Sequence, residues 1–443
     1  MQFTTRKQAE RAISAAAESF VLTRRLSAYE RHTILSRISE GLGEQREDFA
    51  QLICDEAKKP IRDARVEVDR ARLTFSLAAD EARRFGGELL PLDLSAAAVG
   101  KLGLVRRFPL GSVAAVTPFN FPLNLVAHKV APAIAVGAPI VLKPAEKTPR
   151  TALKLQELVR EAGWPEAAFA TLTPETPQEI GHLLADDPRL PVFSFTGSDT
   201  IGWALKQRAN KKRVLLELGG NGAVLVAGDA DIAHAAARCA VGGFAYSGQV
   251  CISVQRVYVA ERHFDAFCEA LVVKAQALKL GDPSDETTDL GPMITEAAAI
   301  RVEQWVAQAL DSGATALLRG KRDGAFLSPT ILTNVPDDQP VVCDEVFGPV
   351  VVVESVASFD EGIARINASR YGLQAGVFTH NLRHILQAHA ELNVGGVIIN
   401  DVPTFRSDAM PYGGEGDSGT GREGIRWAMA EYTSPRVLVL TAP

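Results

Sequence analysis

The sequence lacks an excess of positive charge. Its 443 residues carry 47 Lys and Arg against 53 Asp and Glu, which gives a formal net charge of −6. Proteins that bind nucleic acids or anionic membranes through charge need a basic surface, because contacts to phosphate supply much of their affinity. The charge balance therefore argues against nucleic-acid and membrane partners and favours small-molecule chemistry.

Cysteine is scarce and shows no pattern. The chain has five, widely spaced, without a Cys-x-x-Cys pair or a Cys/His cluster of the kind that binds zinc; they are Cys54, Cys239, Cys251, Cys268 and Cys343. An odd number of scattered thiols is typical of a reducing compartment and not of a disulfide-bonded secreted domain. We therefore expect a cytoplasmic protein without a metal site.

Long apolar runs are also missing. No stretch reaches the roughly 18 unbroken apolar residues that span a bilayer. The N-terminal residues lead into a helical pattern without the apolar core of a signal peptide. What is present is an ordinary globular composition, 47% hydrophobic and 23% charged, in a chain long enough for two or three domains.

Helix-like and strand-like segments alternate over most of the chain. Before Phe85, Ala and Leu recur at three- and four-residue steps, which predicts a helical layer. From residue 112 onward, short apolar runs predict buried strands, each followed by a run with helical spacing; the strands are expected at 112–117, 139–143 and 192–196 and the helices at 123–136, 152–162 and 201–208. Such alternation is typical of a parallel sheet covered on both faces.

A second series of strands and helices runs from residues 223–227 to 396–400. The sequence therefore predicts two α/β domains, joined near residues 218–222. Two segments fall outside both series. Residues 101–107 alternate in a way that suits an exposed hairpin, and residues 434–440 alternate without a nearby partner, so we expect them to pair with another strand edge or another subunit.

Cys251 and Glu217 are the first candidates for chemistry. Cys251 follows Tyr-Ser-Gly-Gln-Val, and Glu217 ends a strand pattern before Leu-Gly-Gly-Asn. A thiol with a nearby carboxylate is typical of a covalent nucleophile and its general base, because a thiol with a pKa of ~8.5 is only a small fraction thiolate at neutral pH. Each residue alone has a simpler interpretation, a buried apolar Cys and a solvated Glu.

Two further motifs follow strands, at the sheet edge where α/β proteins bind ligands. In Thr117-Pro-Phe-Asn-Phe-Pro122, Asn120 could direct an amide N–H at negative charge that develops on a substrate oxygen, although Asn is also common in turns. Lys143 and Glu146 could hold ribose hydroxyls, and a carboxylate there would repel a 2′-phosphate. Two surface charges in a loop are an equally good interpretation of that pair.

The remaining signals are weaker. Gly197 and Ser198 join a strand to a helix and would present backbone N–H groups to a pyrophosphate, but their spacing matches neither common phosphate motif. Glu345 and Phe347 could bind a second ribose and cover a flat ring, or simply close a turn. The long Gly-rich region at 400–423 is of a length that tends to be functional.

Taken in order, seven stretches resemble the aldehyde dehydrogenase superfamily. They span nearly the whole chain and are Pro118-Phe-Asn-Phe-Pro, Lys143-Pro-Ala-Glu, Phe195-Thr-Gly-Ser, Glu217-Leu-Gly-Gly-Asn, Gly248-Gln-Val-Cys, Glu345-Val-Phe-Gly-Pro and the Gly-Gly, Asp-Ser-Gly and Gly-Arg-Glu groups of 413–423. The resemblance implies an enzyme that oxidises a small aldehyde to its carboxylate. It implies NAD as the cofactor, with NADP accepted by some members.

The resemblance also implies roles for individual residues. Cys251 would attack the aldehyde carbon, Asn120 and the Cys251 backbone N–H would hold the oxyanion, and Glu217 would activate the thiol or the water that hydrolyses the thioester. Glu423 resembles a proton-relay residue. The implied cofactor contacts are Thr117, Pro118, Phe119, Lys143, Glu146, Gly197, Ser198, Glu345 and Phe347.

The substrate is less well defined. The run from Asn400 to Asp408 is similar to branches that oxidise lactaldehyde or phosphonoacetaldehyde-like compounds, which implies Phe121, Thr404 and Arg406 as substrate contacts. Arg406 would pair with an anionic tail through bidentate hydrogen bonds, while a solvated loop Arg is the commoner alternative.

Two features depart from the family pattern. Phe119 stands where the family usually has Trp, which keeps an aromatic wall and alters the pocket width. The family's N-terminal β-rich segment is not seen before Lys7, through either a different start site or a loss.

The implied fold class is α/β, with a Rossmann-like cofactor domain, an α/β catalytic domain and a small β flap for oligomerisation. We expect a homodimer or homotetramer. The expected boundaries are 1–90 and 110–217 for the cofactor domain, with 413–428 returning to it, 218–412 for the catalytic domain, and 91–109 and 429–443 for the oligomerisation segments.

Two other functions stay open. A catalytically retired family member could serve as a binding or structural protein, but it would have lost catalytic positions, and all of them are present. A cofactor-independent thioesterase could use Cys251 alone, and a lack of nucleotide binding would favour it.

Overall fold

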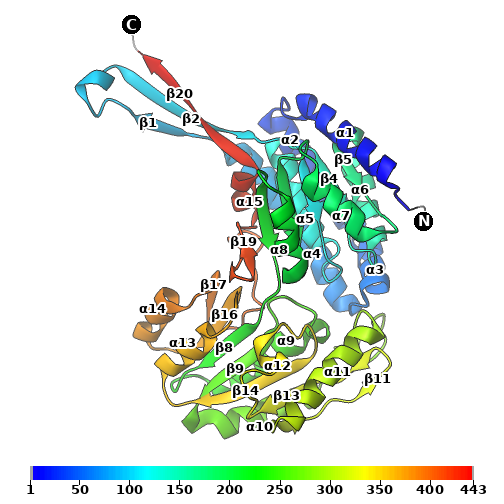
Figure 1. Ribbon diagram of the computed structural model, residues 1–443, viewed down its shortest axis with the longest axis vertical. Coiled ribbons are helices and arrows are strands. Elements are labelled where there is room, and N and C mark those ends of the chain that lie inside the picture. The colour runs from blue at the N-terminus through cyan, green and yellow to red at the C-terminus, as the bar shows by residue number, and fades with distance from the viewer. Residues whose placement is uncertain (1–2, 442–443) are drawn as a thin grey trace.

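Residues 6–84 form four helices. The computed structural model describes residues 3–441 (Figure 1), beginning with helices α1 (Arg6–Thr23), α2 (Ala28–Glu44), α3 (Arg46–Ala57) and α4 (Ile61–Arg84). Thr5 with Gln8 and Ser27 with Glu30 form capping boxes that fix the starts of α1 and α2. The apolar faces of α2 to α4 are buried against helices α5 (Asn124–Val136) and α6 (Pro149–Glu161), with Phe49 and Phe75 fully inaccessible. Helix α1 packs on the opposite face of the adjoining sheet. The predicted helical layer is confirmed.

Six strands form the first sheet, in the order β19-β7-β6-β3-β4-β5. All neighbours are parallel except β19 and β7. The strands are β3 (Val113–Val116), β4 (Ile140–Lys143), β5 (Phe169–Thr171), β6 (Val192–Thr196), β7 (Arg213–Glu217) and β19 (Gly419–Thr420). The crossover helices are α5 (Asn124–Val136), α6 (Pro149–Glu161), α7 (Pro177–Asp186) and α8 (Asp199–Arg208).

This strand order has a switch point. From β3 the chain moves outward through β4 and β5, and then returns to place β6 on the other side of β3. Loops that leave β3 and β6 therefore diverge to opposite faces and open a crevice at the carboxyl ends of these strands, which is where open α/β sheets bind ligands. The predicted α/β class with a Rossmann-like parallel sheet is confirmed.

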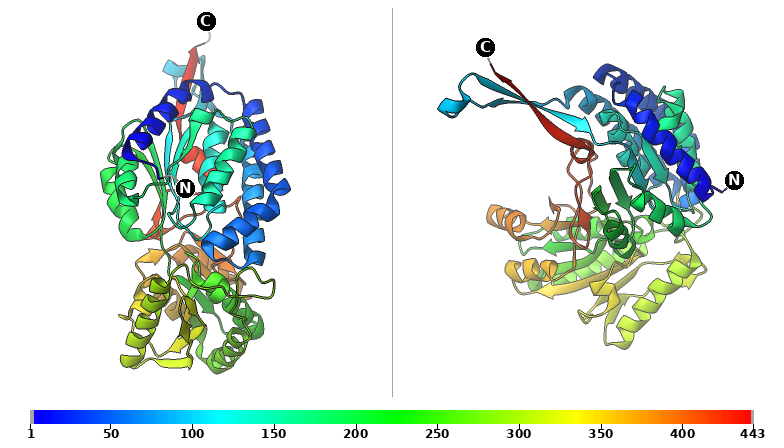
Figure 2. Two further views of the ribbon diagram at one scale, coloured as in Figure 1. Left: turned by 90° about the vertical axis from the view of Figure 1, so that its right-hand side faces the viewer. Right: turned by 45° about the horizontal axis from the view of Figure 1, so that its top comes forward.

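Seven strands form the second sheet, in the order β10-β13-β14-β9-β8-β16-β17, parallel except for β10. They are β8 (Gly222–Val226), β9 (Val254–Ala260), β10 (Thr315–Leu318), β13 (Thr330–Thr333), β14 (Val350–Val356), β16 (Gln374–Phe378) and β17 (Gly396–Ile399). Its helices are α9 (Ile232–Phe244), α10 (Phe264–Gln276), α11 (Glu296–Asp311), α13 (Phe359–Asn367) and α14 (Leu382–Glu391). Figure 2 shows this sheet and its helices below the first sheet.

The chain passes between the two sheets more than once. It crosses from β7 to β8 through residues 218–221. It returns after β17 by a long loop, and β19 then pairs with β7, Gly419 opposite Glu217. The Gly-rich segment before α15 (Ile425–Glu431) is therefore held against the end of the first sheet, so that residues from both sheets meet there.

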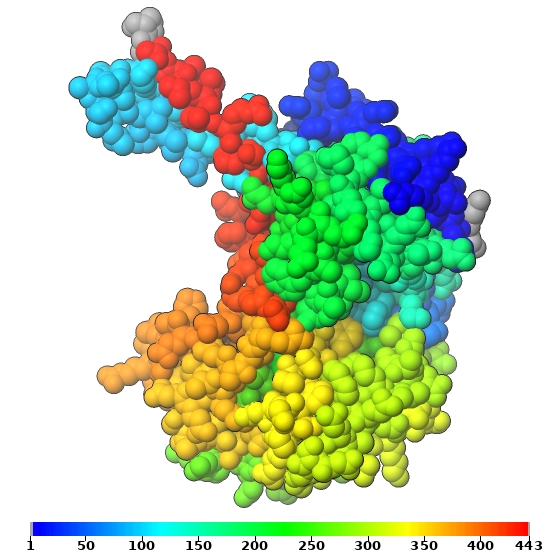
Figure 3. Space-filling model, in the orientation of Figure 1, coloured from blue at the N-terminus to red at the C-terminus, as the bar shows by residue number. Residues whose placement is uncertain are grey.

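A three-stranded sheet projects from the body. It consists of β1 (Glu88–Pro91), β2 (Lys101–Pro109) and β20 (Thr433–Thr441), in the order β1-β2-β20. We call residues 88–109 and 433–441 the flap. It extends away from the body in Figure 1, and in Figure 3 it projects from the upper left of the molecule. Val437 to Leu440 are each about half exposed. Among residues 3–441, no helix has both the length and the apolar character needed to cross a membrane.

Candidate active site

A constrained turn presents Cys251. It follows a short 3-10 turn, Ala245–Gly248, in which Tyr246 and Ser247 have positive φ angles of 50° and 54° and Gly248 has 70°. A Cβ at Gly248 would collide with the carbonyl oxygen of Gly348, so this position needs glycine for two reasons. The Gln249 side chain is buried and accepts the Ile294 N–H at 2.9 Å, which fixes the chain just before Cys251.

Asn120 meets this turn from the first sheet. It lies in the loop after β3, is buried, and donates from Nδ2 to the carbonyl oxygen of Gln249 at 3.0 Å. Its Oδ1 is buried and has no hydrogen-bond partner among the described residues. One amide N–H is thus used to hold the Cys251 loop, and the second is left to a group beside Cys251.

Glu217 is a buried carboxyl without partners. It ends β7 and is 3% exposed, and neither of its oxygens has a hydrogen bond within residues 3–441. A Cβ placed on Gly413 would lie 2.8 Å from Glu217 Oε1, so the Gly-rich loop packs directly on the carboxyl. Burial, and then the charge of Glu423, raise the pKa of Glu217 well above its usual value.

Glu423 has the opposite surroundings. Its Oε1 accepts from Lys129 Nζ at 3.0 Å and its Oε2 from Arg406 Nη2 at 3.1 Å. Burial works to raise the pKa of Glu423, but the two cations outweigh it and hold the pKa at about 2. Two neighbouring carboxyl groups with pKa values pushed apart are typical of sites that divide acid and base roles.

Arg406 connects this ion cluster to the thiol. Its guanidinium carbon lies 3.6 Å from the centre of the Tyr412 ring, and the Tyr412 hydroxyl lies 3.1 Å from Cys251 Sγ. Burial raises the pKa of Cys251 to about 11, and the hydrogen bond from Tyr412 acts in the opposite direction. The sequence did not single out Lys129 or Tyr412. Lys129 lies in a helix that is mostly apolar, and a Lys in such a helix is an unusual core residue that could have been noticed.

The structure does not leave Arg406 as a solvated loop residue. Its side chain is 6% exposed and one of its terminal nitrogens is paired with Glu423. Its Nε is buried and has no partner among the described residues. Thr404, two residues earlier, is half buried. The Phe121 ring lies 3.6 Å from the buried Lys59 Nζ and stands edge-on to Tyr246, in the turn before Cys251.

A cavity of about 710 Å³ opens at the switch point of the first sheet. It is lined by most of the predicted cofactor contacts, namely Thr117, Pro118, Phe119, Lys143, Glu146, Gly197 and Ser198. The Thr117 and Thr196 hydroxyls are buried without partners among the described residues. A Cβ on Gly181, which also lines the cavity, would touch nothing within 4 Å. Open space, unpaired hydroxyls and the first N–H groups of α8 beside Ser198 together fit a dinucleotide.

Lys143 and Glu146 pair with each other at one wall of the cavity. Lys143 Nζ lies 2.5 Å from Glu146 Oε1. The Lys143 side chain is largely buried, whereas that of Glu146 is 47% exposed. The exposed carboxylate oxygens stay accessible to ribose hydroxyls.

Glu345 and Phe347 reach the same region from the second sheet. Glu345 Oε1 accepts the Gly220 N–H at 3.0 Å, and burial raises the pKa of Glu345 to about 7. Phe347 has a positive φ of 48°, a strained conformation for a non-glycine residue, and its ring stands edge-on to Phe119 with centroids 5.9 Å apart. The structure thus brings together residues that lie more than two hundred positions apart in sequence.

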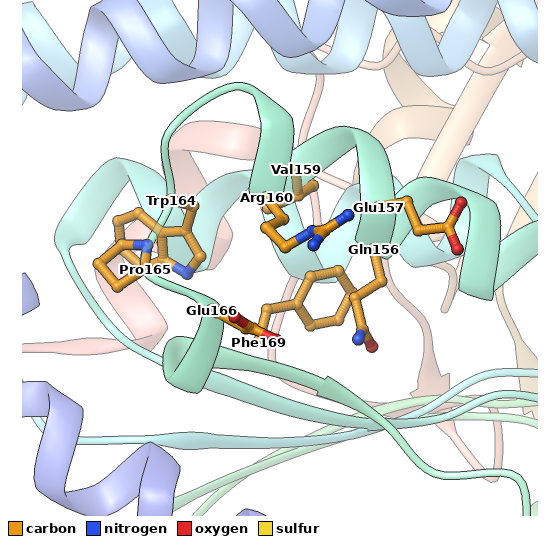
Figure 4. A pocket seen from close by; sticks show the side chains of 8 residues that line it. All are labelled: Gln156, Glu157, Val159, Arg160, Trp164, Pro165, Glu166 and Phe169. Atoms are coloured by element: carbon orange, nitrogen blue, oxygen red, sulfur yellow. The ribbon is translucent and has the colours of Figure 1, made fainter.

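Not every cavity belongs to this site. A cavity of about 240 Å³ lies between α6 and the segment that leads into β5, with Arg160 and the rings of Trp164 and Phe169 among its lining side chains (Figure 4). None of the predicted site residues lines it. Within residues 3–441, no group of three or more His, Cys, Asp or Glu side chains is placed to hold a metal ion.

Three comparisons show what the chain is similar to. A family model described as "Aldehyde dehydrogenase family" matches residues 1–438. A 3-sulfolactaldehyde dehydrogenase of Priestia megaterium is 44% identical over 436 residues, which cover 98% of this chain and 91% of that protein.

Solved structures give the same result. Aldehyde dehydrogenase 21 of Physcomitrella patens, in complex with the reaction product succinate, superimposes with a TM-score of 0.96 at 44% identity and covers 99% of this chain and 91% of its own. The glyceraldehyde-3-phosphate dehydrogenase GapN of Methanocaldococcus jannaschii, complexed with NADP, has a TM-score of 0.95 at 38% identity and covers 100% of this chain and 96% of its own.

Proposed function

This chain belongs to the aldehyde dehydrogenase family, and from that premise we propose that it oxidises a small aldehyde to its carboxylate, with NAD as the hydride acceptor and NADP as an alternative. The observation that carries the proposal is the convergence on Cys251 of groups from distant parts of the chain. Asn120 binds the turn before it, Tyr412 contacts its sulfur, and the unpaired Glu217 carboxyl packs against the loop that follows Tyr412.

Cys251 is the proposed nucleophile. Its thiolate attacks the aldehyde carbon, the S–C bond forms, and the carbonyl electron pair moves to oxygen. The second N–H of Asn120 and the backbone N–H of Cys251 donate to that oxyanion, as preorganised donors do in acyl-transfer sites. A nicotinamide held by Glu345 and Phe347 would supply the hydride acceptor. As the same carbon loses its hydride, the oxyanion electron pair re-forms the C=O bond and a thioester remains on Cys251.

Glu217 is the proposed base for hydrolysis. It takes a proton from water, the hydroxide attacks the thioester, and the C–S bond breaks to release the carboxylate. The buried carboxyl holds its proton to an unusually high pH, so it must first pass that proton on. Glu423, bridged by Lys129 and Arg406, is the nearby carboxylate that we propose for a relay. Because these two cations hold its pKa at about 2, the proton crosses Glu423 only transiently on its way to solvent.

The cofactor is proposed to lie in the cavity at the switch point. The Thr117 to Phe119 segment and Gly197 with Ser198 form its walls, Lys143 and Glu146 face the adenosine ribose, and Glu345 with Phe347 face the nicotinamide ribose. The Glu146 carboxylate would repel a 2′-phosphate, which supports NAD as the preferred cofactor. Comparing kcat/KM for NAD and NADP tests this assignment, and a strong NADP preference would contradict it.

A small aldehyde with an anionic tail is the proposed substrate. Relatives named for sulfolactaldehyde, sulfoacetaldehyde and lactaldehyde support a short polar chain. We propose Arg406 Nε, which has no partner among the described residues, as a donor to the tail, with Thr404 and Phe121 as further contacts. If Arg406→Met raised KM equally for anionic and neutral aldehydes, this assignment would be wrong.

One experiment tests the proposed reaction. Reduced cofactor is followed by absorbance for a panel of small aldehydes with the full-length protein, with Cys251→Ala, and with Cys343→Ala as a control that removes an exposed thiol. We expect turnover by the protein and by Cys343→Ala and none by Cys251→Ala. No turnover with any aldehyde would favour a retired enzyme, and thioester hydrolysis without nucleotide would favour a thioesterase.

We also propose the domain division and assembly that the sequence indicates. Residues 1–90, 110–217 and 413–428 form a cofactor domain, 218–412 a catalytic domain, and 91–109 with 429–443 oligomerisation segments of a homodimer or homotetramer. The exposed apolar residues of β20 support the last assignment. The cytoplasmic location stays a prediction, which cell fractionation checks.

A further inference from the structure

A second large cavity lies where the flap joins the body. Its volume is about 780 Å³, within the range of small-molecule sites. Its walls come from the α1–α2 turn, the end of α4, the end of α5 and strand β2 of the flap. Six of its lining residues are arginines: Arg24, Arg25, Arg31, Arg83, Arg106 and Arg107.

The positive charge of this cavity is not compensated. Glu88 is the one carboxylate among its lining residues. Within residues 3–441, none of the six arginines forms an ion pair with a carboxylate. Elsewhere the chain pairs its arginines readily, as Arg65 does with both Glu47 and Glu286. The six arginines of this cavity therefore differ from such arginines because they are clustered and have no carboxylate partner.

Arg31 is an arginine of this cavity whose guanidinium is partly buried. It lies in the first turn of α2, and one of its terminal nitrogens would be 3.3 Å from a Cβ placed on Gly137, directly after α5. Its Nε is buried without a hydrogen-bond partner among the described residues. Burial lowers the pKa of this guanidinium, and the charge of the neighbouring Glu30 offsets only part of that effect. An unpaired buried donor costs free energy, so an anion at this position would remove that cost.

Arg107 is held in place by neutral groups. Its Nε donates to the Thr433 hydroxyl at 2.9 Å and its Nη2 to the Ala430 carbonyl oxygen at 2.7 Å. These acceptors fix the side chain without cancelling its charge. A guanidinium that is already ordered loses little side-chain entropy when it binds an anion.

We propose that this cavity binds a small molecule carrying two or more phosphate groups. Arginine forks match phosphate oxygens in pairs. Arg31 and Arg107 are the two less exposed arginines of the cavity, and the other four stand at its more exposed rim. The bound molecule joins β2 of the flap to α2 of the body. This proposal does not depend on the proposed reaction, since the cavity shares no lining residue with the switch-point cavity.

Calorimetry with inorganic triphosphate tests the proposal. Excess NAD is present, so that the switch-point cavity is not available to the probe. We expect one saturable site on the full-length protein and a rise in Tm with triphosphate concentration, because a ligand that binds only the folded state stabilises it. Arg31→Gln should weaken binding by about tenfold or more, the loss expected for one charge-assisted hydrogen bond.

Two further variants make the result decisive. Arg24→Gln with Arg106→Gln removes rim charges on exposed side chains and should weaken binding even if Arg31→Gln fails to fold. Arg319→Gln removes an exposed cation that does not line the cavity and should leave the affinity unchanged. An absence of saturable binding, or an equal loss in Arg319→Gln, would overturn the proposal.

The probes also identify the source of the phosphate. Equal affinities for inorganic triphosphate and adenosine triphosphate assign recognition to the phosphate chain alone, and tighter binding of adenosine triphosphate assigns it to a nucleotide. Citrate carries three carboxylates and serves as the anion control. If citrate bound as tightly as triphosphate, the assignment to phosphate would be wrong.

Discussion

At the scale of single residues, ionisation of the Cys251 thiol depends on the hydroxyl of Tyr412. Cys251 lies in surroundings that raise its pKa to about 11, and Tyr412 is the side chain that hydrogen-bonds its sulfur. Arg406, stacked on the Tyr412 ring, adds positive charge behind the hydroxyl. The thiolate that the proposed reaction needs is therefore supported from the side of the Gly-rich loop.

Tyr412→Phe should make the thiol harder to ionise. Because the lost hydrogen bond favours the thiolate, the pKa of Cys251 rises and alkylation by iodoacetamide at a fixed pH slows by about tenfold. The rate of alkylation against pH measures this directly, with Tyr29→Phe as an exposed control. An unchanged profile in Tyr412→Phe would show that the hydroxyl only packs against the sulfur.

Glu423→Gln should shift the pH dependence of turnover. The charge of Glu423 helps to raise the pKa of Glu217, so its removal lowers that pKa, and it also leaves Lys129 and Arg406 free to favour the Glu217 carboxylate. Turnover that rises as Glu217 loses its proton should then rise at lower pH than in the unmodified protein. Measuring kcat against pH for both proteins checks the direction, and a shift to higher pH would contradict it.

Residue identities were easier to predict than their pairings. Cys251, Glu217 and Asn120 stand in short ordered motifs, and short motifs are visible in a sequence. Lys129 and Arg406 meet at Glu423 only because α5, the loop after β17 and the segment after β19 converge, and that convergence depends on tertiary packing. The burial of Arg406 could not be predicted for the same reason.

At the scale of elements, the turn before Cys251 sets the position of the nucleophile. Three consecutive residues, Tyr246 to Gly248, have positive φ angles, and Gly248 also faces the carbonyl oxygen of Gly348. The strand and helix patterns around the turn were predicted to within a few residues. Its backbone conformation was not, because nothing in Tyr-Ser-Gly specifies left-handed angles at Tyr and Ser.

Gly248→Ala and Gly313→Ala distinguish the free-energy cost of a positive φ angle from the cost of a steric collision. Both glycines have positive φ, 70° and 103°, but a Cβ on Gly313 would meet nothing within 4 Å, whereas one on Gly248 collides with Gly348. We expect Gly313→Ala to lose about 1 kcal/mol of unfolding free energy and Gly248→Ala to lose about 2–4 kcal/mol together with activity. Urea unfolding of both variants measures the difference, and equal losses would mean that the turn adapts.

At the scale of the whole molecule, the flap is incomplete in isolation. Strand β20 is nine residues long and lies at the edge of its sheet, so one row of its backbone groups has no partner strand within that sheet. A long apolar edge is a site for pairing with another chain. The alternation at residues 434–440 predicted an edge strand. Its pairing with β2, over three hundred positions earlier, could not be predicted from the sequence because it depends on the tertiary fold.

Leu438→Asp with Leu440→Asp should disrupt assembly. The two side chains are about half exposed on the same side of β20, and two carboxylates there would have to be desolvated in an interface. Light scattering should show a smaller particle than for the unmodified protein, whereas Val273→Asp, on an exposed position of α10, should leave the mass unchanged. A protein that is already a monomer would contradict the expected oligomer.

The pairing of β19 with β7 has a consequence for how the protein is made. A ribosome builds the chain from its N-terminus, and domains generally fold in that order during synthesis. The residues that line the switch-point cavity end at Leu205, so all of them have been synthesised when less than half of the chain has emerged. Tyr412, Glu423 and the β19 segment that seals Glu217 emerge near the end. During translation, the residues that line the nucleotide-sized cavity are therefore made well before the reactive thiol has its full set of neighbours, and the Cys251 site is completed only near the end of synthesis.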